Sequence, residues 1–104
     1  PRLPRDVAAA RAEATTLVDH DPVLAAGWLL AGDVAALDGR APEAVRAYER
    51  AERLAPRSVA PPLRLAELHL RRGEPDAAAA AARRALLADP ANGHARRLLA
   101  VAER

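Results

Sequence analysis

The feature that most constrains this chain is a set of small and cyclic residues that returns after thirty-four positions. The recurring residues are two glycines, four alanines and two prolines: Gly39 and Gly73, Ala44 and Ala78, Ala51 and Ala85, Pro56 and Pro90. A fixed period of this length, with room for two helices in each unit, is typical of a solenoid of stacked helical hairpins. We therefore predict an all-α fold, with about six antiparallel helices in a short right-handed α-solenoid. Its 104 residues are predicted to form one domain, 1–104.

The first two predicted helices precede Gly39. One runs from Pro4 to Asp19, with proline in the first turn, where its missing N–H costs nothing. The second runs from Pro22 to Leu37, and Asp21 is its predicted N-cap. Apolar residues surround most of this second helix, which is typical of a helix packed between neighbours. Gly32 lies in its middle at a cost of roughly 1 kcal/mol against alanine, so we expect another helix to approach closely there.

The rest of the chain divides at two predicted turns, Asp38–Arg40 and Arg72–Glu74. Each contains a glycine, the residue that most readily takes the left-handed conformation that ends a helix. Four further helices are predicted: Pro42 to about Leu54; a helix with Ser58 as N-cap and Pro61 and Pro62 in its first turn; Pro75 to Ala88; and a helix capped by Asn92 or a neighbouring residue that runs to about Arg104.

Composition excludes several classes of protein. The sixteen basic residues are all arginine, but fourteen carboxylates are interleaved with them and the net charge is +2. The small excess of positive charge is therefore weak evidence for nucleic-acid binding, and we expect the protein to bind no nucleic acid. Without cysteine there is no disulfide, thiolate nucleophile or sulfur metal ligand. No apolar run approaches the length of a membrane span and no signal peptide is visible.

Origin and compartment are less constrained. The bias toward Ala, Arg and Pro suggests a GC-rich coding genome and hence a bacterial source. The sequence is compatible with a cytoplasmic or a periplasmic location. A first residue of Pro1, in place of Met, leaves open a processed form or a piece of a larger protein.

The segment 25–58 carries a bulky residue, three small residues, an aromatic residue and a proline at repeat positions 4, 8, 20, 24, 27 and 32. In that order these are Trp28, Gly32, Ala44, Tyr48, Ala51 and Pro56. The pattern resembles the tetratricopeptide repeat family. The resemblance implies a second unit at 59–92, an N-terminal half-unit at 4–20 and a C-terminal capping helix at 93–104.

The second unit departs from this pattern at two positions. Pro62 stands in place of the bulky residue and Ala82 in place of the aromatic one. We expect Leu65 and Leu86 to restore the lost volume. Trp28 and Tyr48, the two aromatic residues of the chain, are both expected in the core.

The resemblance also implies a concave groove lined by the first helix of each unit. The implied groove residues are Ala26, Leu29, Asp33, Ala36 and Leu37, then Ala60, Leu63, Glu67, Leu70 and Arg71, then His94, Arg97, Val101 and Arg104. We expect a strip of leucines with an acidic wall and a basic C-terminal end. Such a groove would take an apolar or amphipathic segment with acidic groups near Arg71, Arg97 and Arg104.

The family has a well-known clamp for the terminal carboxylate of a peptide. Its positions fall on Leu29, Asp33, Arg64, His94 and Leu98. Because only Arg64 and, weakly, His94 could hold a carboxylate, we expect no tail binding of that type.

No residue pattern indicates catalysis, a cofactor or a metal site. Ser58 is the only serine and is interpreted as a cap, and His69 is interpreted as a packed, hydrogen-bonded side chain. Asp19, His20 and Asp21 form the only cluster of ligand-type residues, but adjacent side chains point in different directions and seldom chelate together. The pairs at 71–72, 83–84 and 96–97 are interpreted as solvated arginines, with a patch for an anionic partner as the alternative.

The sequence therefore predicts non-catalytic protein–protein interaction through the groove. The alternative is a module that self-associates or belongs to a longer array. By register, the helix 4–19 lacks its own partner, so one side of the helix 22–37, Leu29 and Leu30 especially, would be uncovered and open to further repeats or a second copy. A regulatory segment of a larger enzyme is a third reading.

Overall fold

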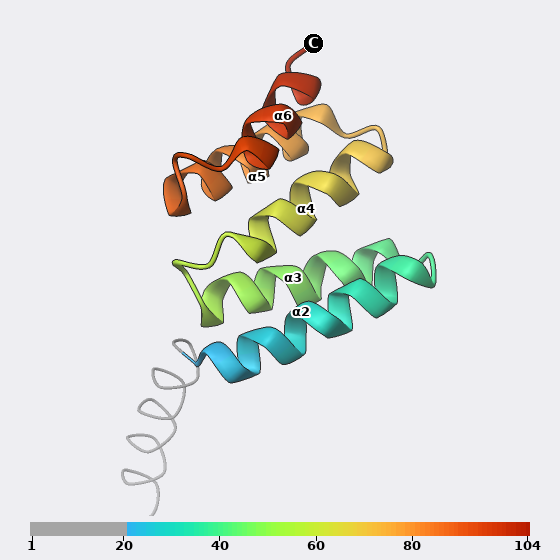
Figure 1. The fold of residues 1–104 in the computed structure, drawn as a ribbon. Coiled ribbons are helices and arrows are strands. Elements are labelled where there is room, and N and C mark those ends of the chain that lie inside the picture. The colour runs from blue at the N-terminus through green and yellow to red at the C-terminus, as the bar shows by residue number, and fades with distance from the viewer. Residues whose placement is uncertain (1–20) are drawn as a thin grey trace, which may run out of the picture.

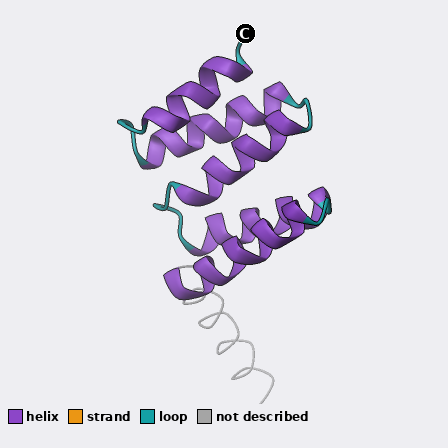
Figure 2. Cartoon of the chain, turned by 45° about the vertical axis from the view of Figure 1, so that its right-hand side comes forward, coloured by secondary structure: helices purple, strands orange, loops and turns teal. Residues whose placement is uncertain are grey.

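The structure is a computed structural model and describes residues 21–104. The described helices are α2 (Pro22–Leu37), α3 (Ala41–Leu54), α4 (Ala60–Arg71), α5 (Pro75–Ala88) and α6 (Gly93–Ala102). They stack in chain order (Figure 1), and no strand occurs among these residues (Figure 2). Each helix contacts the next, and α4 also contacts both α2 and α6. The all-α fold of repeated helical hairpins is confirmed, while the predicted helix Pro4–Asp19 lies outside the described residues.

Both hairpin turns end on a glycine with positive φ, as predicted. Gly39 has φ +74° and Gly73 has φ +69°. After α2, the N–H of Arg40 bonds to the carbonyl of Ala35 at 2.8 Å. After α4, the equivalent bond joins Glu74 to the carbonyl of His69, also at 2.8 Å. The same helix-ending motif therefore recurs one period later, because glycine alone takes this conformation without steric cost.

The helix starts agree with the predicted caps at α2 and α6. Asp21 Oδ1 accepts hydrogen bonds from the N–H groups of Val23 and Leu24 at 2.9 and 3.2 Å. Asn92 Oδ1 accepts one from Ala95 at 2.9 Å. Both caps satisfy amide groups that have no partner within the helix.

The predicted cap of α4 is wrong by one residue. Val59 is the N-cap residue, and no side chain caps this helix. The reason is that Pro61 and Pro62 occupy the positions whose N–H groups a cap would bind, and proline has none. Ser58, which precedes the helix by two residues, instead accepts a long hydrogen bond of 3.4 Å from the N–H of Ala60, the first residue of α4.

The main core cluster joins both units. Its largest members are Tyr48 on α3 and Leu65 and Leu68 on α4. A Cβ built on Gly32 would lie 2.5 Å from two ring carbons of Tyr48, so the expected close approach at this glycine is confirmed. Leu65 is buried, as expected for a residue that restores volume in the second unit.

Trp28 does not lie in the core, contrary to our expectation. Its exposed fraction is 43%. Its counterpart one period later, Pro62, is fully buried, because α4 lies between α3 and α5 in the stack (Figure 1). Within the described residues, no helix precedes α2 to cover Trp28 in the same way.

Candidate functional site

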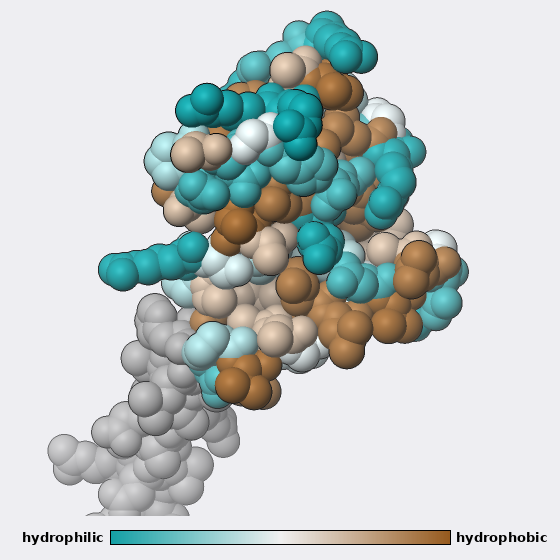
Figure 3. All heavy atoms as spheres, in the orientation of Figure 1, coloured by the Kyte–Doolittle hydropathy of each residue, from teal (hydrophilic) through white to brown (hydrophobic). Residues whose placement is uncertain are grey.

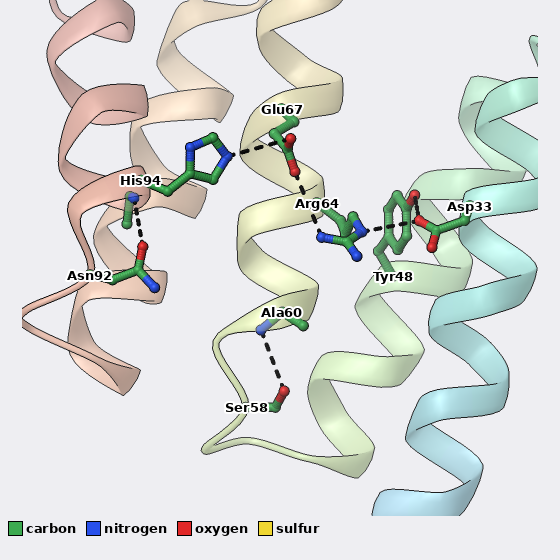
Figure 4. A network of polar contacts seen from close by, with 9 residues as sticks. Asp33, Tyr48, Ser58, Ala60, Arg64, Glu67, Asn92 and His94 are labelled. Atoms are coloured by element: carbon green, nitrogen blue, oxygen red, sulfur yellow. Dashed lines mark hydrogen bonds and ion pairs between the residues drawn. The ribbon is translucent and has the colours of Figure 1, made fainter.

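A row of charged and titratable side chains crosses the face shared by α2, α4 and α6. Arg64 Nε donates to Asp33 Oδ1 at 3.2 Å, and its Nη1 lies 3.9 Å from Glu67 Oε1. His94 Nε2 lies 3.5 Å from the other oxygen of Glu67. These contacts link one helix of each unit (Figure 4). We call Asp33, Arg64, Glu67 and His94 the charge ladder.

Tyr48 anchors the ladder to the core. Its hydroxyl donates to Asp33 Oδ1 at 2.5 Å, the same oxygen that Arg64 contacts. Burial of the side chain and this hydrogen bond together raise the pKa of Tyr48 well above its usual value of about 10, although Arg64 and Arg71 act in the opposite direction. Tyr48 is therefore a neutral donor at physiological pH.

A cavity of about 490 Å³ opens between α2 and α4 beside the ladder. We call it the α2–α4 cavity. It is lined by Asp33, Ala36, Leu37, Tyr48, Arg64, Glu67 and Arg71. The volume lies within the range of ligand-binding pockets in proteins, about 300–1,000 Å³. It therefore presents an apolar side chain, Leu37, and an arginine, Arg71, at the edge of a hydrogen-bonded polar floor.

Comparison with known families agrees with this architecture. A family model described as tetratricopeptide repeat matches residues 35–102, and a second model with the same description matches residues 5–59. The chain belongs to the tetratricopeptide repeat family. No curated protein matches the chain. Repeats of this family generally mediate protein–protein interaction and are typically non-catalytic.

The tetratricopeptide repeat pattern placed fourteen residues on the groove, and the structure separates them into three groups. Asp33, Ala36, Leu37, Glu67 and Arg71 line the α2–α4 cavity. Ala26, His94, Arg97, Val101 and Arg104 are exposed outside it, and Arg104 lines a different cavity, formed by α5 and the end of α6. Leu29, Ala60 and Leu70 are half-buried, while Leu63 is buried.

The expected strip of leucines is therefore mostly core. Leu63 is 9% exposed and packs against Ala85 and Ala95, and Leu70 packs against a cluster on α5 and α6. Leu37, at 88% exposed, is the one leucine of the fourteen that lies fully open to solvent in the cavity. The physical reason is stacking: α5 and α6 cover Leu63 and Leu70 of α4, whereas Leu37 is the last residue of α2.

Sequence reasoning missed two lining residues, Tyr48 and Arg64. Tyr48 was assigned only to the core and Arg64 only to the carboxylate clamp. A usable signal was present, because Asp33 and Arg64 are opposite charges spaced about one period apart on neighbouring first helices. These two residues are 31 positions apart, close to the period of 34.

The other candidate residues take structural places. His69 is half-buried and its Nδ1 lies 2.8 Å from Glu74 Oε1, which confirms a packed, hydrogen-bonded histidine. This contact, chiefly, lowers the pKa of Glu74 below its usual value. The three arginine pairs are exposed, as predicted. Of the residues 19–21, only Asp21 is described, and it acts as a cap.

Residues 21–104 contain neither a cluster of metal-ligating side chains nor a helix that could span a membrane. No group of three or more His, Asp or Glu side chains is arranged to hold a metal ion in this part of the chain. None of its helices has both the length and the apolar character needed to cross a bilayer.

Proposed function

We propose that this tetratricopeptide repeat domain is a non-catalytic scaffold that binds a peptide or helix segment of a partner protein on the face shared by α2, α4 and α6. The observation that carries the proposal is the α2–α4 cavity. Leu37 is almost fully exposed there, although burying a leucine side chain contributes about 1.5–3 kcal/mol. A partner that covers Leu37 would gain that free energy without disturbing the core.

The charge ladder supports the same proposal. It joins the three helices through side chains alone, and it satisfies the polar groups of the cavity floor before any ligand arrives. A pre-organised surface loses little conformational freedom on binding. The ladder would therefore hold the cavity open in the shape that the partner recognises.

The test is a matched pair of leucine substitutions. Leu37→Asp places a charge in the cavity, whereas Leu87→Asp places one on α5, where Leu87 is 83% exposed and lines no part of the cavity. Both variants should keep wild-type thermal stability. The partner is recovered by pull-down, and its affinity is measured by calorimetry. We expect Leu37→Asp to lower this affinity about tenfold or more, which corresponds to about 1.4 kcal/mol of binding free energy. Equal affinity of both variants would refute binding in the cavity.

A second candidate function, self-association, is favoured by the outer face of α2. Trp28, Ala31 and Val34 on α2 correspond, one period later, to Pro62, Leu65 and Leu68 on α4. The α4 set is buried and the α2 set is exposed. Figure 3 shows hydrophobic residues gathered at the α2 end of the molecule. Exposed apolar patches of this kind often mark an interface.

The other end of the stack determines how two copies would meet. α6 exposes Arg96 and Arg97, and Arg104 is exposed just after it, so a head-to-tail contact would press arginines onto apolar residues. Pairing of α2 with α2 around a two-fold axis avoids that cost.

Light scattering tests self-association directly. A dimer would show twice the 11.0 kDa mass of one chain. Leu30→Glu on the exposed face of α2 should restore the monomer, and Leu87→Glu should not. A wild-type mass of 11.0 kDa at every concentration would exclude the dimer.

A further inference from the structure

The acidic groups of the α2–α4 cavity are already engaged. Asp33 accepts hydrogen bonds from Tyr48 and Arg64 on a single oxygen, and Glu67 lies between Arg64 and His94. A cation from a ligand would have to compete with these internal donors. The cavity therefore offers little to a basic segment.

Arg71 is different from the other charged residues of the cavity. Its guanidinium is exposed and makes no hydrogen bond or ion pair with another described residue, whereas Arg64 contacts two carboxylates. Its positive charge opposes the upward shift of the Tyr48 pKa that burial and Asp33 produce. A guanidinium presents parallel N–H donors that match a carboxylate with two bonds. Arg71 can therefore take an acidic side chain without breaking an internal contact.

Leu37 and Arg71 occupy the same place on successive units. They are thirty-four residues apart, one repeat period, and both line the α2–α4 cavity. Packed helices lie roughly 10 Å apart. An extended chain covers that distance in about three residues, at roughly 3.3 Å per residue. A helix rises only about 1.5 Å per residue, so it would need about two turns to cover the same distance.

We propose that the segment recognised in the α2–α4 cavity is extended and acidic, with an apolar side chain on Leu37 and a carboxylate side chain on Arg71, three residues apart. This inference rests on the proposed binding of a partner segment in the α2–α4 cavity, and it specifies the chemistry of that segment. The carboxylate lies on the α4 side of the apolar residue. Binding weakens with added salt, because the contact with Arg71 is exposed and screened.

The probes are fluorescein-labelled peptides of about ten residues with an Ala, Gln and Ser background. Each carries one Leu and one Glu, separated by one to seven positions and placed in both orders, with Gln and Lys versions at the Glu position. Fluorescence anisotropy against the whole chain gives the affinity. We expect the tightest binding at a separation of three, and about tenfold weaker binding of the Gln version.

Charge reversal separates recognition by Arg71 from a general effect of charge. Arg71→Glu should lose about tenfold in affinity for the Glu peptide and should instead bind the Lys peptide. The matched control is Arg53→Glu, because Arg53 is exposed on α3 and is also without a hydrogen bond or ion pair to a described residue. This control should bind like the wild type. If Arg71 only stabilised its helix, Arg71→Glu would not change the preference from the Glu peptide to the Lys peptide.

The outcomes distinguish this inference from the function beneath it. If the wild type binds the Glu, Gln and Lys peptides with equal affinity and Leu37→Asp binds none of them, the ligand is not selected for acidic character. Binding in the α2–α4 cavity would still be supported by that result. A best separation of six or seven would overturn the extended conformation. Absence of binding by every probe, or binding that Leu37→Asp leaves unchanged, would count against the groove itself and against the inference with it.

Discussion

At the scale of single residues, the first unit depends on a contact between a glycine and an aromatic ring. Gly32 lies in the middle of α2, where glycine costs about 1 kcal/mol against alanine. The ring of Tyr48, which is 2% exposed, occupies the space that a Cβ on Gly32 would need. The second unit has Ala66 and Ala82 at these two places, so two small residues stand where the first unit has a glycine and a large aromatic ring.

Substitution of the two glycines of α2 tests this contact. Gly32→Ala should destabilise the domain by about 1–3 kcal/mol, because the buried ring has to move. Gly27→Ala, in the same helix, has open space at its Cβ and should stabilise by up to about 1 kcal/mol. Urea denaturation measures both. The same sign for the two variants would show that helix propensity, and not packing, governs position 32.

Removal of the Tyr48 hydroxyl has an effect that depends on pH. Tyr48→Phe should cost about 1–2 kcal/mol at neutral pH, because the bond to the Asp33 carboxylate is lost. The pKa of Tyr48 is raised in the folded state, so above about pH 10 the unfolded chain binds fewer protons and stability falls by up to about 1.4 kcal/mol per pH unit. The Phe variant lacks this loss.

The gap in stability between Tyr48→Phe and the wild type should therefore be full below pH 10 and should narrow above it. Denaturation at about pH 8, 10 and 11 measures the gap. A gap that stays constant through this range would mean that Asp33 does not hold the hydroxyl in solution.

At the scale of helices, each end is built from a different chemical device. α2 and α6 begin with side-chain caps, α4 begins with two prolines that need no cap, and α2 and α4 end on glycine. These devices act within a few residues of the chain. Their energies should therefore be separable and local.

Cap deletions should follow the hydrogen bonds seen at each helix start. Asp21→Ala and Asn92→Ala should each cost about 1 kcal/mol, because each removes a good acceptor. Ser58→Ala should cost less, within about 0.5 kcal/mol, because its bond to Ala60, the first residue of the helix, is long. Thermal denaturation followed by circular dichroism ranks the three. An equal or larger loss at Ser58 would contradict the assignment of Val59 as the N-cap residue.

At the scale of the whole molecule, one core cluster makes the two units interdependent. It contains residues of α2, α3, α4 and α5, with Leu65 at 1% exposure as its most buried leucine. In a solenoid each unit is stabilised largely by its neighbours. Damage at this junction should therefore spread to both hairpins.

Leu65→Ala should destabilise the domain by about 2–5 kcal/mol through lost contacts and a cavity. Hydrogen exchange should lose protection in the hairpin α2–α3 as well as in α4–α5, since the cluster spans both. Leu87→Ala, on the surface of α5, is the control and should change stability by less than about 0.5 kcal/mol. Loss of protection confined to α4 and α5 would show that the units fold independently.

The sequence alone determined the repeat, the bounds of α2 and α5, both left-handed glycines and the caps of α2 and α6, because all of these depend on a few neighbouring residues. The resemblance to the tetratricopeptide repeat family, and not spacing alone, placed Asp33, Leu37, Glu67 and Arg71 together on the groove. Exposure was decided by tertiary structure: Trp28 and Pro62 hold equivalent positions, yet one is open and the other buried. Tertiary packing also decided that Leu63 is buried in the core and that Tyr48 lines the α2–α4 cavity. Which helix stacks on which is a non-local property, and no residue carries it by itself.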